Sequence, residues 1–111
     1  MPDSLVLTLD VDDLDLQTAF WCGALGYTHA GTFSQYHALV DPAGKGPNML
    51  LQRVDEAKVA KNRLHLDFHV VDASAEAERL EALGATRVRQ VDEFGITWFA
   101  MLDPEGNEFC V

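Results

Sequence analysis

An internal repeat constrains the fold of this chain more than any other feature of its sequence. Each half contains an apolar strand, then a helical pattern that ends in Leu-Gly, then an Asp-Pro-x-Gly turn. These signals occupy residues 5–13, 25–26 and 41–44 in the first half, and residues 64–72, 83–84 and 103–106 in the second half. A repeat of this length predicts two copies of one supersecondary unit, packed as a single domain. We therefore expect functional residues to lie between the two halves.

Composition limits the partners that this chain can bind. It has 111 residues, 48% of them hydrophobic, and a formal net charge of -10. These values predict one globular domain over residues 1–111, with a first module at about 4–55 and a second at about 63–111. The acidic balance argues against nucleic acid as a partner. The first residues lack the pattern of a signal peptide and no apolar stretch reaches membrane-spanning length, so we expect a cytoplasmic protein without a membrane partner.

Period-two alternation and helical spacing predict ten elements of an α+β fold. The predicted strands cover residues 5–11, 27–30, 36–40 and 48–54 in the first half, and 64–70, 86–91, 97–102 and 108–111 in the second. One predicted helix follows Asp12 or Asp13 and ends at Gly26. The other follows Asp72 and ends at Gly84.

The remaining segments have structural interpretations. Residues 55–62 are predicted to be a charged connector with a helical turn. Phe20 and Trp21, in the middle of the first helix, are predicted to lie in the core. His29 and His37 lie near turns or strand edges and are predicted to be solvated or lightly hydrogen-bonded. The two cysteines lack the spacing of a disulfide framework and are predicted to be free thiols.

Five short motifs in order resemble those of a known superfamily. They are Ala19-Phe20-Trp21, Leu25-Gly26-Tyr27, residues 62–67, Leu83-Gly84-Ala85 and residues 103–109. In these motifs, and in its doubled strand-helix-three-strand order, the chain resembles the vicinal oxygen chelate superfamily. Within it, the chain is similar to the glyoxalase-like branch, with its bleomycin resistance proteins and dioxygenases. The resemblance implies two tandem βαβββ modules that form a cupped, mostly antiparallel sheet with helices on the outside, a small-molecule site in the cup, and a homodimer.

The same resemblance implies positions for a divalent metal ion. In the metal-using members, one ligand comes from the first strand of each module and another from the last strand. His65 matches in the second module, but Val6 occupies the position in the first, and Cys110 stands where the family has a glutamate. Because Val6 has no donor atom, we expect no complete metal site and no cofactor. A displaced site would use His65 and Glu108, with Cys110 or Gln52, and would hold Ni, Co, Mn, Zn or Fe.

Polar side chains that share one face of their strands are predicted to line the cup. The predicted ligand-binding residues are Thr8, Asp10, His65, Asp67, His69, Trp98, Glu108 and Cys110. Adjacent strand residues face opposite ways, so either Trp98 lines the cup, or Phe99 and Met101 do so in its place. The acidic members of this set favour a cationic or hydrogen-bond-donating ligand.

Three kinds of function fit these residues. The first is a binding protein that takes a small organic molecule into the cup without metal. The second is an enzyme, either a metal-dependent lyase or isomerase of the glyoxalase type, or a metal-free acid/base catalyst. In the metal-free enzyme, His65 or His69 would act with Glu108 or Asp67, because histidine titrates near neutrality. The third is a dimerising interaction module, which short edge strands permit.

Overall fold

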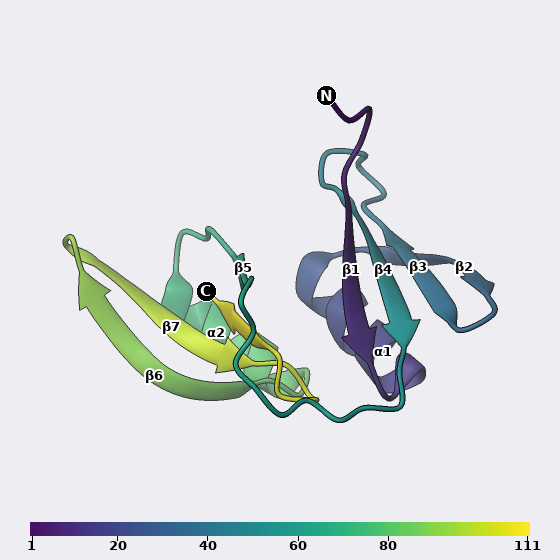
Figure 1. Cartoon of the computed structure of the whole chain (residues 1–111). Helices are drawn as coiled ribbons and strands as arrows, with labels where there is room; N and C mark the ends of the chain where they lie inside the picture. Colours follow the sequence, from purple (N-terminus) through teal and green to yellow (C-terminus); the bar gives the residue numbers. More distant parts are fainter. The chain divides into compact units, whose positions relative to one another are not determined.

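The computed structural model describes all 111 residues, which divide into two compact units, Met1–Ala57 and Lys58–Val111. The first unit contains β1 (Val6–Val11), α1 (Leu14–Leu25), β2 (Thr28–Phe33), β3 (Tyr36–Val40) and β4 (Asn48–Arg53). The second contains β5 (Leu66–Asp67), α2 (Ala73–Ala82), β6 (Thr86–Glu93), β7 (Ile96–Leu102) and β8 (Glu108–Cys110) (Figure 1). Both units have the order βαβββ, so the predicted α+β class with tandem modules is confirmed.

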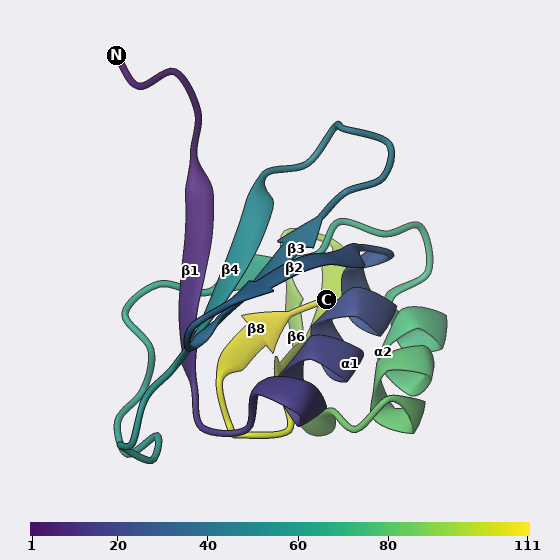
Figure 2. The same ribbon diagram turned by 90° about the vertical axis from the view of Figure 1, so that its right-hand side faces the viewer.

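In the first unit, α1 packs against a mixed four-stranded sheet. The strand order is β1-β4-β3-β2, in which β1 and β4 are parallel and the other pairs antiparallel (Figure 2). The Asp13 side chain accepts a hydrogen bond from the Leu16 N–H at 3.0 Å and begins α1, while Gly26, with a φ of 71°, ends it. Phe20 and Trp21 are each 2% exposed, which confirms their predicted place in the core.

In the second unit, α2 packs against a sheet of order β5-β8-β7-β6, and β5 and β8 form its parallel pair. The Asp72 side chain accepts a hydrogen bond from the Ala75 N–H at 3.0 Å and begins α2. The buried apolar side chains of this unit include Ala77, Leu80, Phe99, Met101 and Phe109. No helix of the chain has the length and apolar character needed to cross a membrane.

Two predicted elements differ from the structure. The strand predicted over residues 64–70 is reduced to Leu66–Asp67, because its neighbour β8 offers only Glu108–Cys110 for pairing. Leu64, at the predicted start, is 77% exposed. The helical turn predicted in residues 55–62 is wrong, since this connector has bends but no helix.

The strand register preserves the internal repeat. In the second unit, one row of paired residues crosses β5, β8, β7 and β6 and consists of Asp67, Cys110, Ala100 and Arg89. The equivalent row of the first unit crosses β1, β4, β3 and β2 and consists of Thr8, Leu50, Ala38 and Gly31. A β-bulge precedes the last member of each row, where the register shifts. The two rows share their geometry, and only the second carries charged side chains.

Candidate functional site

The candidate site lies on the face of the second sheet opposite α2, which we name the polar face (Figure 1). On the α2 side, Phe99 and Met101 are 5% and 0% exposed. Side chains alternate along a strand, so Trp98 on β7 projects from the polar face, as does its half-buried neighbour Cys110 on β8. Of the two adjacent aromatic residues, Trp98 therefore lies on the polar face and Phe99 in the core.

Backbone pairing sets the order of groups along the polar face. Asp67 pairs with Cys110, Cys110 with Ala100, and Ala100 with Arg89. Because Ala100 has a small side chain, it projects little from the sheet in the middle of this row. Trp98 lies two residues before Ala100 on β7 and so stands beside the row on the same face. An aromatic surface and polar groups therefore occupy one side of the sheet.

A cluster of three polar groups forms one end of the row. Nδ1 of His65 lies 2.8 Å from Oδ1 of Asp67, and ligating atoms of His65, Asp67 and Cys110 all lie within 4.8 Å of one another. A carboxylate only accepts hydrogen bonds, so the Nδ1–H of His65 donates to Asp67. In the neutral imidazole, this leaves the Nε2 lone pair available. The cluster can therefore donate and accept hydrogen bonds, and it can accept a proton.

The Cys110 side chain is a thiol in this setting. Burial raises its pKa, and the nearby charge of Asp67 raises it further, whereas the positive charges of Arg89 and Lys61 oppose this effect. The net direction is upward, which disfavours the thiolate needed for nucleophilic attack. Cys110 therefore suits contact with a ligand better than covalent chemistry.

Glu108 also lies on the polar face, where its carboxylate holds the connector against β8. Oε1 lies 3.0 Å from Nζ of Lys58, and Oε2 accepts a hydrogen bond from the Asn62 N–H at 2.9 Å. Burial alone would raise the pKa of Glu108, but the hydrogen bonds from Asn62 and Lys58 outweigh it and lower the pKa to about 2. Glu108 is thus a carboxylate at neutral pH and cannot serve as a proton donor. This anchoring role was not predicted from the sequence.

The bulge in β6 directs two arginines to opposite faces. Arg87 pairs with Met101 on the α2 side, where its guanidinium carbon lies 4.5 Å from the centre of the Phe99 ring and its Nη2 donates to Glu81 at 2.8 Å. Arg89 pairs with Ala100 and projects from the polar face. Arg89 was not among the predicted site residues. Simple alternation over the predicted strand would place both arginines on the same face. The spacing of Arg87 and Arg89, two positions apart, is the sequence feature that could have indicated Arg89 as a site residue.

The predicted residues of the first unit lie on its exposed sheet face. Thr8 and Asp10 are exposed on β1, and Gln52 pairs with Asp10. Val6, at the metal position implied by the resemblance, is 52% exposed and has an apolar side chain. The cluster of His65 and its neighbours is made of second-unit residues alone, and ligand binding by Thr8 and Asp10 stays a prediction.

The other histidines have distinct environments. His69 lies beyond the end of β5 and is exposed. His37 is only 7% exposed, its Nδ1 lies 2.7 Å from Oγ1 of Thr18, and its ring is stacked on that of His29 at 4.4 Å. Of the two predicted alternatives for His37, solvation is wrong because β3 turns this residue toward α1, whereas a hydrogen-bonded histidine agrees with the contact to Thr18. His29 is exposed and lightly hydrogen-bonded, as predicted.

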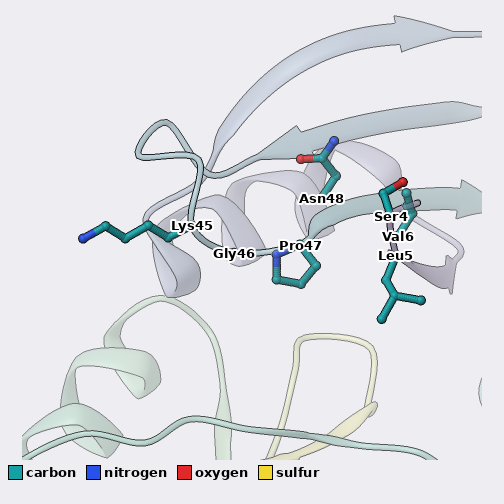
Figure 3. Close-up of a pocket in the computed structure, with 7 residues that line it drawn as sticks. All are labelled: Ser4, Leu5, Val6, Lys45, Gly46, Pro47 and Asn48. Carbon is teal, nitrogen blue, oxygen red and sulfur yellow. The ribbon is translucent and has the colours of Figure 1, made fainter. Parts of the chain in front are cut away.

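A separate hollow of about 360 Å³ lies in the first unit. Its lining residues are Ser4, Leu5, Val6, Lys45, Gly46, Pro47 and Asn48 (Figure 3). In Figure 3, Lys45 lies at one side of the hollow and Leu5 and Val6 at the other. Lys45 is its one titratable side chain, and none of the polar-face residues lines it. The hollow therefore lacks the paired groups that acid/base chemistry needs.

The donor atoms near His65 do not form the metal set that the resemblance implies. His65, Asp67 and Cys110 are the side chains that could hold an ion. A histidine nitrogen with a cysteine sulfur suits Zn²⁺, whereas Mn²⁺ prefers oxygen ligands. Cys110 would also have to lose a proton against its raised pKa. Together with the absence of a donor at Val6, this makes the complete family site a poor fit to these residues.

Comparison with known proteins identifies the family. Residues 6–111 match the family model described as a glyoxalase-like domain. No curated protein sequence matches the chain. Among solved structures, the chain is similar to the fosfomycin resistance protein FosX from Listeria monocytogenes, with 18% identity, a TM-score of 0.80 and coverage of 99% of this chain and 91% of that chain.

Two further structures share the fold. A glyoxalase/bleomycin resistance protein/dioxygenase family enzyme from Burkholderia phytofirmans PsJN is 15% identical, with a TM-score of 0.77 and coverage of 95% of this chain and 93% of that chain. A variant of the Listeria FosX, in complex with Mn(II) and 1S,2S-dihydroxypropylphosphonic acid, is 19% identical, with a TM-score of 0.80 and coverage of 99% and 89%. Because the family model covers residues 6–111, this chain belongs to the glyoxalase-like domain family.

Proposed function

We propose that this chain binds a small organic molecule on the polar face of its second unit. The observation that carries the proposal is the convergence of His65, Asp67 and Cys110 within 4.8 Å of one another, on the face from which Trp98 projects. Ligand sites combine an apolar or aromatic surface with a few polar groups that fix orientation. The polar face has both.

Each group has a separate part in binding. The half-buried indole of Trp98 offers a flat surface for stacking. Asp67 accepts hydrogen bonds, and His65 binds through Nε2, because its Nδ1 is occupied by Asp67. The neutral thiol of Cys110 completes the contact. None of these interactions needs a metal ion.

Related structures support a small organic ligand. The FosX variant was solved with a dihydroxypropylphosphonic acid and Mn(II). In this chain, the alternative with a divalent metal would make the protein a lyase or isomerase of the glyoxalase type. We favour binding without metal, because Val6 offers no donor atom.

Four compounds with one benzyl skeleton test the binding proposal: benzyl alcohol, benzylamine, phenylacetate and benzylphosphonate. We expect at least one of them to shift the backbone amide signals of Asp67, Trp98, Ala100 and Cys110 in a chemical-shift titration. Replacing Trp98 by Ala should weaken that binding about fivefold or more, since aromatic stacking contributes roughly 1 kcal/mol beyond buried area. Phe94→Ala is the matched control, because Phe94 is an exposed aromatic residue at the β6–β7 turn. Failure of all four compounds to shift these amides would contradict the proposal.

A second candidate function is metal-free acid/base catalysis. The hydrogen bond of 2.8 Å between His65 and Asp67 favours it, because a carboxylate on Nδ1 orients an imidazole whose Nε2 can take a proton. Glu108 is less suited to this role, since its carboxylate is engaged by Lys58 and Asn62. For any substrate that is turned over, Asp67→Asn should lower kcat more than it raises KM. An equal rate in this variant would contradict acid/base catalysis by the pair of His65 and Asp67.

Two broader expectations are part of this proposal. We propose that the protein acts in the cytoplasm. We also propose that it forms a homodimer, as the family resemblance implies. Sedimentation equilibrium over a range of concentrations would test the second point. A single species with the mass of one 12.3 kDa chain would contradict it.

A further inference from the structure

We propose that the polar face selects an organic anion, such as a carboxylate or a phosphonate, and that Arg89 binds its anionic group. This inference rests on the proposed function and names the class of ligand. Asp67 and Glu108 on the same face had predicted a cationic ligand, but their environments in the structure argue for the opposite charge.

Four basic residues belong to no salt bridge, and of these Arg89 alone lies on a strand, whereas Lys45, Lys61 and Arg63 lie in loops. The chain has 8 Lys and Arg against 18 Asp and Glu. The basic residues in salt bridges with carboxylates are Arg53, Lys58, Arg79 and Arg87. In a chain with so many carboxylates, an arginine on a sheet face that forms no salt bridge is a candidate to bind an anionic ligand. Its planar guanidinium can hold a carboxylate or phosphonate through two parallel hydrogen bonds.

The acidic groups of the polar face are engaged by other residues. Asp67 accepts the hydrogen bond of His65 at 2.8 Å, and Glu108 contacts Lys58 at 3.0 Å. These contacts reduce the repulsion that either carboxylate would exert on a bound anion. No salt bridge engages Arg89, so its positive charge is available to an anion at this end of the row.

The β-bulge shows that the position of Arg89 depends on a specific backbone feature. Bulges are frequent beside active sites, where they change the direction of a side chain. In β6, the register shift between Arg87 and Arg89 sends Arg87 toward α2 and Arg89 to the polar face. The equivalent position of the first unit, after a bulge at the same place, is Gly31. Since the fold accommodates a residue without a side chain there, the charge of Arg89 is not required to build the sheet.

The spacing along the row indicates the size of the ligand. Arg89 and Asp67 are separated by three strand-to-strand steps, which is about 14 Å between their Cα atoms at roughly 4.8 Å per step. The paired residues between them are Ala100, which has a small side chain, and Cys110. A compact organic acid can therefore place its anionic group at Arg89 and an oxygen atom at His65, with Trp98 alongside.

The four benzyl compounds also test this inference. We expect phenylacetate and benzylphosphonate to bind about tenfold or more tightly than benzyl alcohol, and benzylamine to bind most weakly. Arg89→Gln should abolish the tighter binding of the two anions and leave the affinity for benzyl alcohol unchanged. Arg89→Lys should keep part of the tighter binding of the anions. Lys45→Gln is the matched control, because Lys45 is another cation without a salt bridge and lies in the first unit.

The outcomes separate this inference from the function on which it rests. Binding of benzylamine or benzyl alcohol at Trp98, with no gain for the anions, would overturn the inference and keep the proposed function. The same holds if Arg89→Gln binds the anions as tightly as the parent protein does. An equal loss in Lys45→Gln and Arg89→Gln would show a general charge effect and would also overturn the role of Arg89. No binding of any compound at the polar face would overturn both.

Discussion

At the scale of single residues, Asp41 and Asp103 show how one carboxylate organises a turn. The Asp41 carboxylate accepts hydrogen bonds from the N–H groups of Ala43, Lys45 and Gly46 at 2.9, 3.0 and 2.8 Å. The Asp103 carboxylate accepts bonds from the backbone of Glu105 and Asn107 and from the Asn107 amide, each at 2.9 Å. The repeated Asp-Pro-x-Gly motif therefore encodes a hydrogen-bonding arrangement as well as a bend.

Asp41 supports a prediction about acid stability. The backbone hydrogen bonds from Gly46 and Ala43 lower its pKa below the ordinary value of 3.8. A carboxyl with a lower pKa in the folded state stabilises the fold above its unfolded pKa, and this stabilisation disappears as the pH falls through the folded pKa. We expect Asp41→Asn to melt at a lower temperature than the parent protein at neutral pH, with the difference shrinking below about pH 4.

Thermal unfolding followed by circular dichroism from neutral to acid pH would measure this difference. Asp3→Asn removes the same charge from an exposed residue near the start of the chain and should change the melting temperature little at any pH. A constant gap between Asp41→Asn and the parent protein over the whole range would contradict the role given to the Asp41 carboxylate.

At the scale of elements, the sequence predicted what depends on neighbouring residues and missed what depends on partners far along the chain. The helix starts at Asp13 and Asp72 follow from side chains that cap the next turn, so local sequence was sufficient. The short β5 depends on the three residues that β8 offers, and the bulge before Arg89 depends on the register with β7. Neither the length of β5 nor the position of the bulge can be predicted from the residues of that strand alone.

In the candidate site, too, local spacing predicted some contacts, and contacts with distant residues could not be predicted. Period-two spacing placed Asp67 with His65, and the structure confirms their contact. The engagement of Glu108 was not predictable, because its partner Lys58 lies 50 residues earlier in the chain. Arg89 was not predicted, and its face depends on a bulge that interrupts simple alternation in β6.

The anchoring of the connector by Glu108 supports a prediction about local opening. Glu108→Gln removes the ion pair with Lys58 and weakens the bond from Asn62, so residues 58–62 should detach from β8 more often. Hydrogen bonds to a charged group contribute about 2 kcal/mol, so we expect roughly tenfold or faster trypsin cleavage after Lys58, Lys61 and Arg63.

Limited proteolysis followed by mass spectrometry would identify these cleavage sites. Glu93→Gln is a suitable control, because Glu93 is an exposed carboxylate at the end of β6 and belongs to no salt bridge. Cleavage of Glu108→Gln at the rate of the parent protein would show that the connector is held by other contacts.

At the scale of the whole molecule, the two units share a fold but differ in the chemistry of their sheets. The row of Asp67, Cys110 and Arg89 in the second unit corresponds to Thr8, Leu50 and Gly31 in the first. The duplicated backbone therefore keeps its pairing, while this row carries charged side chains in the second copy only. A fold can retain its geometry through such changes because backbone pairing and the apolar face toward the helix stabilise it.

This asymmetry leads to a prediction about metal binding. Val6 and Cys110 stand at two of the three positions that supply ligands in metal-using relatives, and neither offers a hard oxygen donor. Titration of metal-free protein with Mn(II) in a calorimeter should therefore give no stoichiometric binding. A titration with Zn(II) is the comparison, since His65, Asp67 and Cys110 suit Zn(II) better than Mn(II). Heat of binding that is absent in His65→Ala would come from this cluster. Stoichiometric Mn(II) binding that is lost in His65→Ala would contradict the prediction and would favour metal-dependent lyase or isomerase chemistry over simple ligand binding.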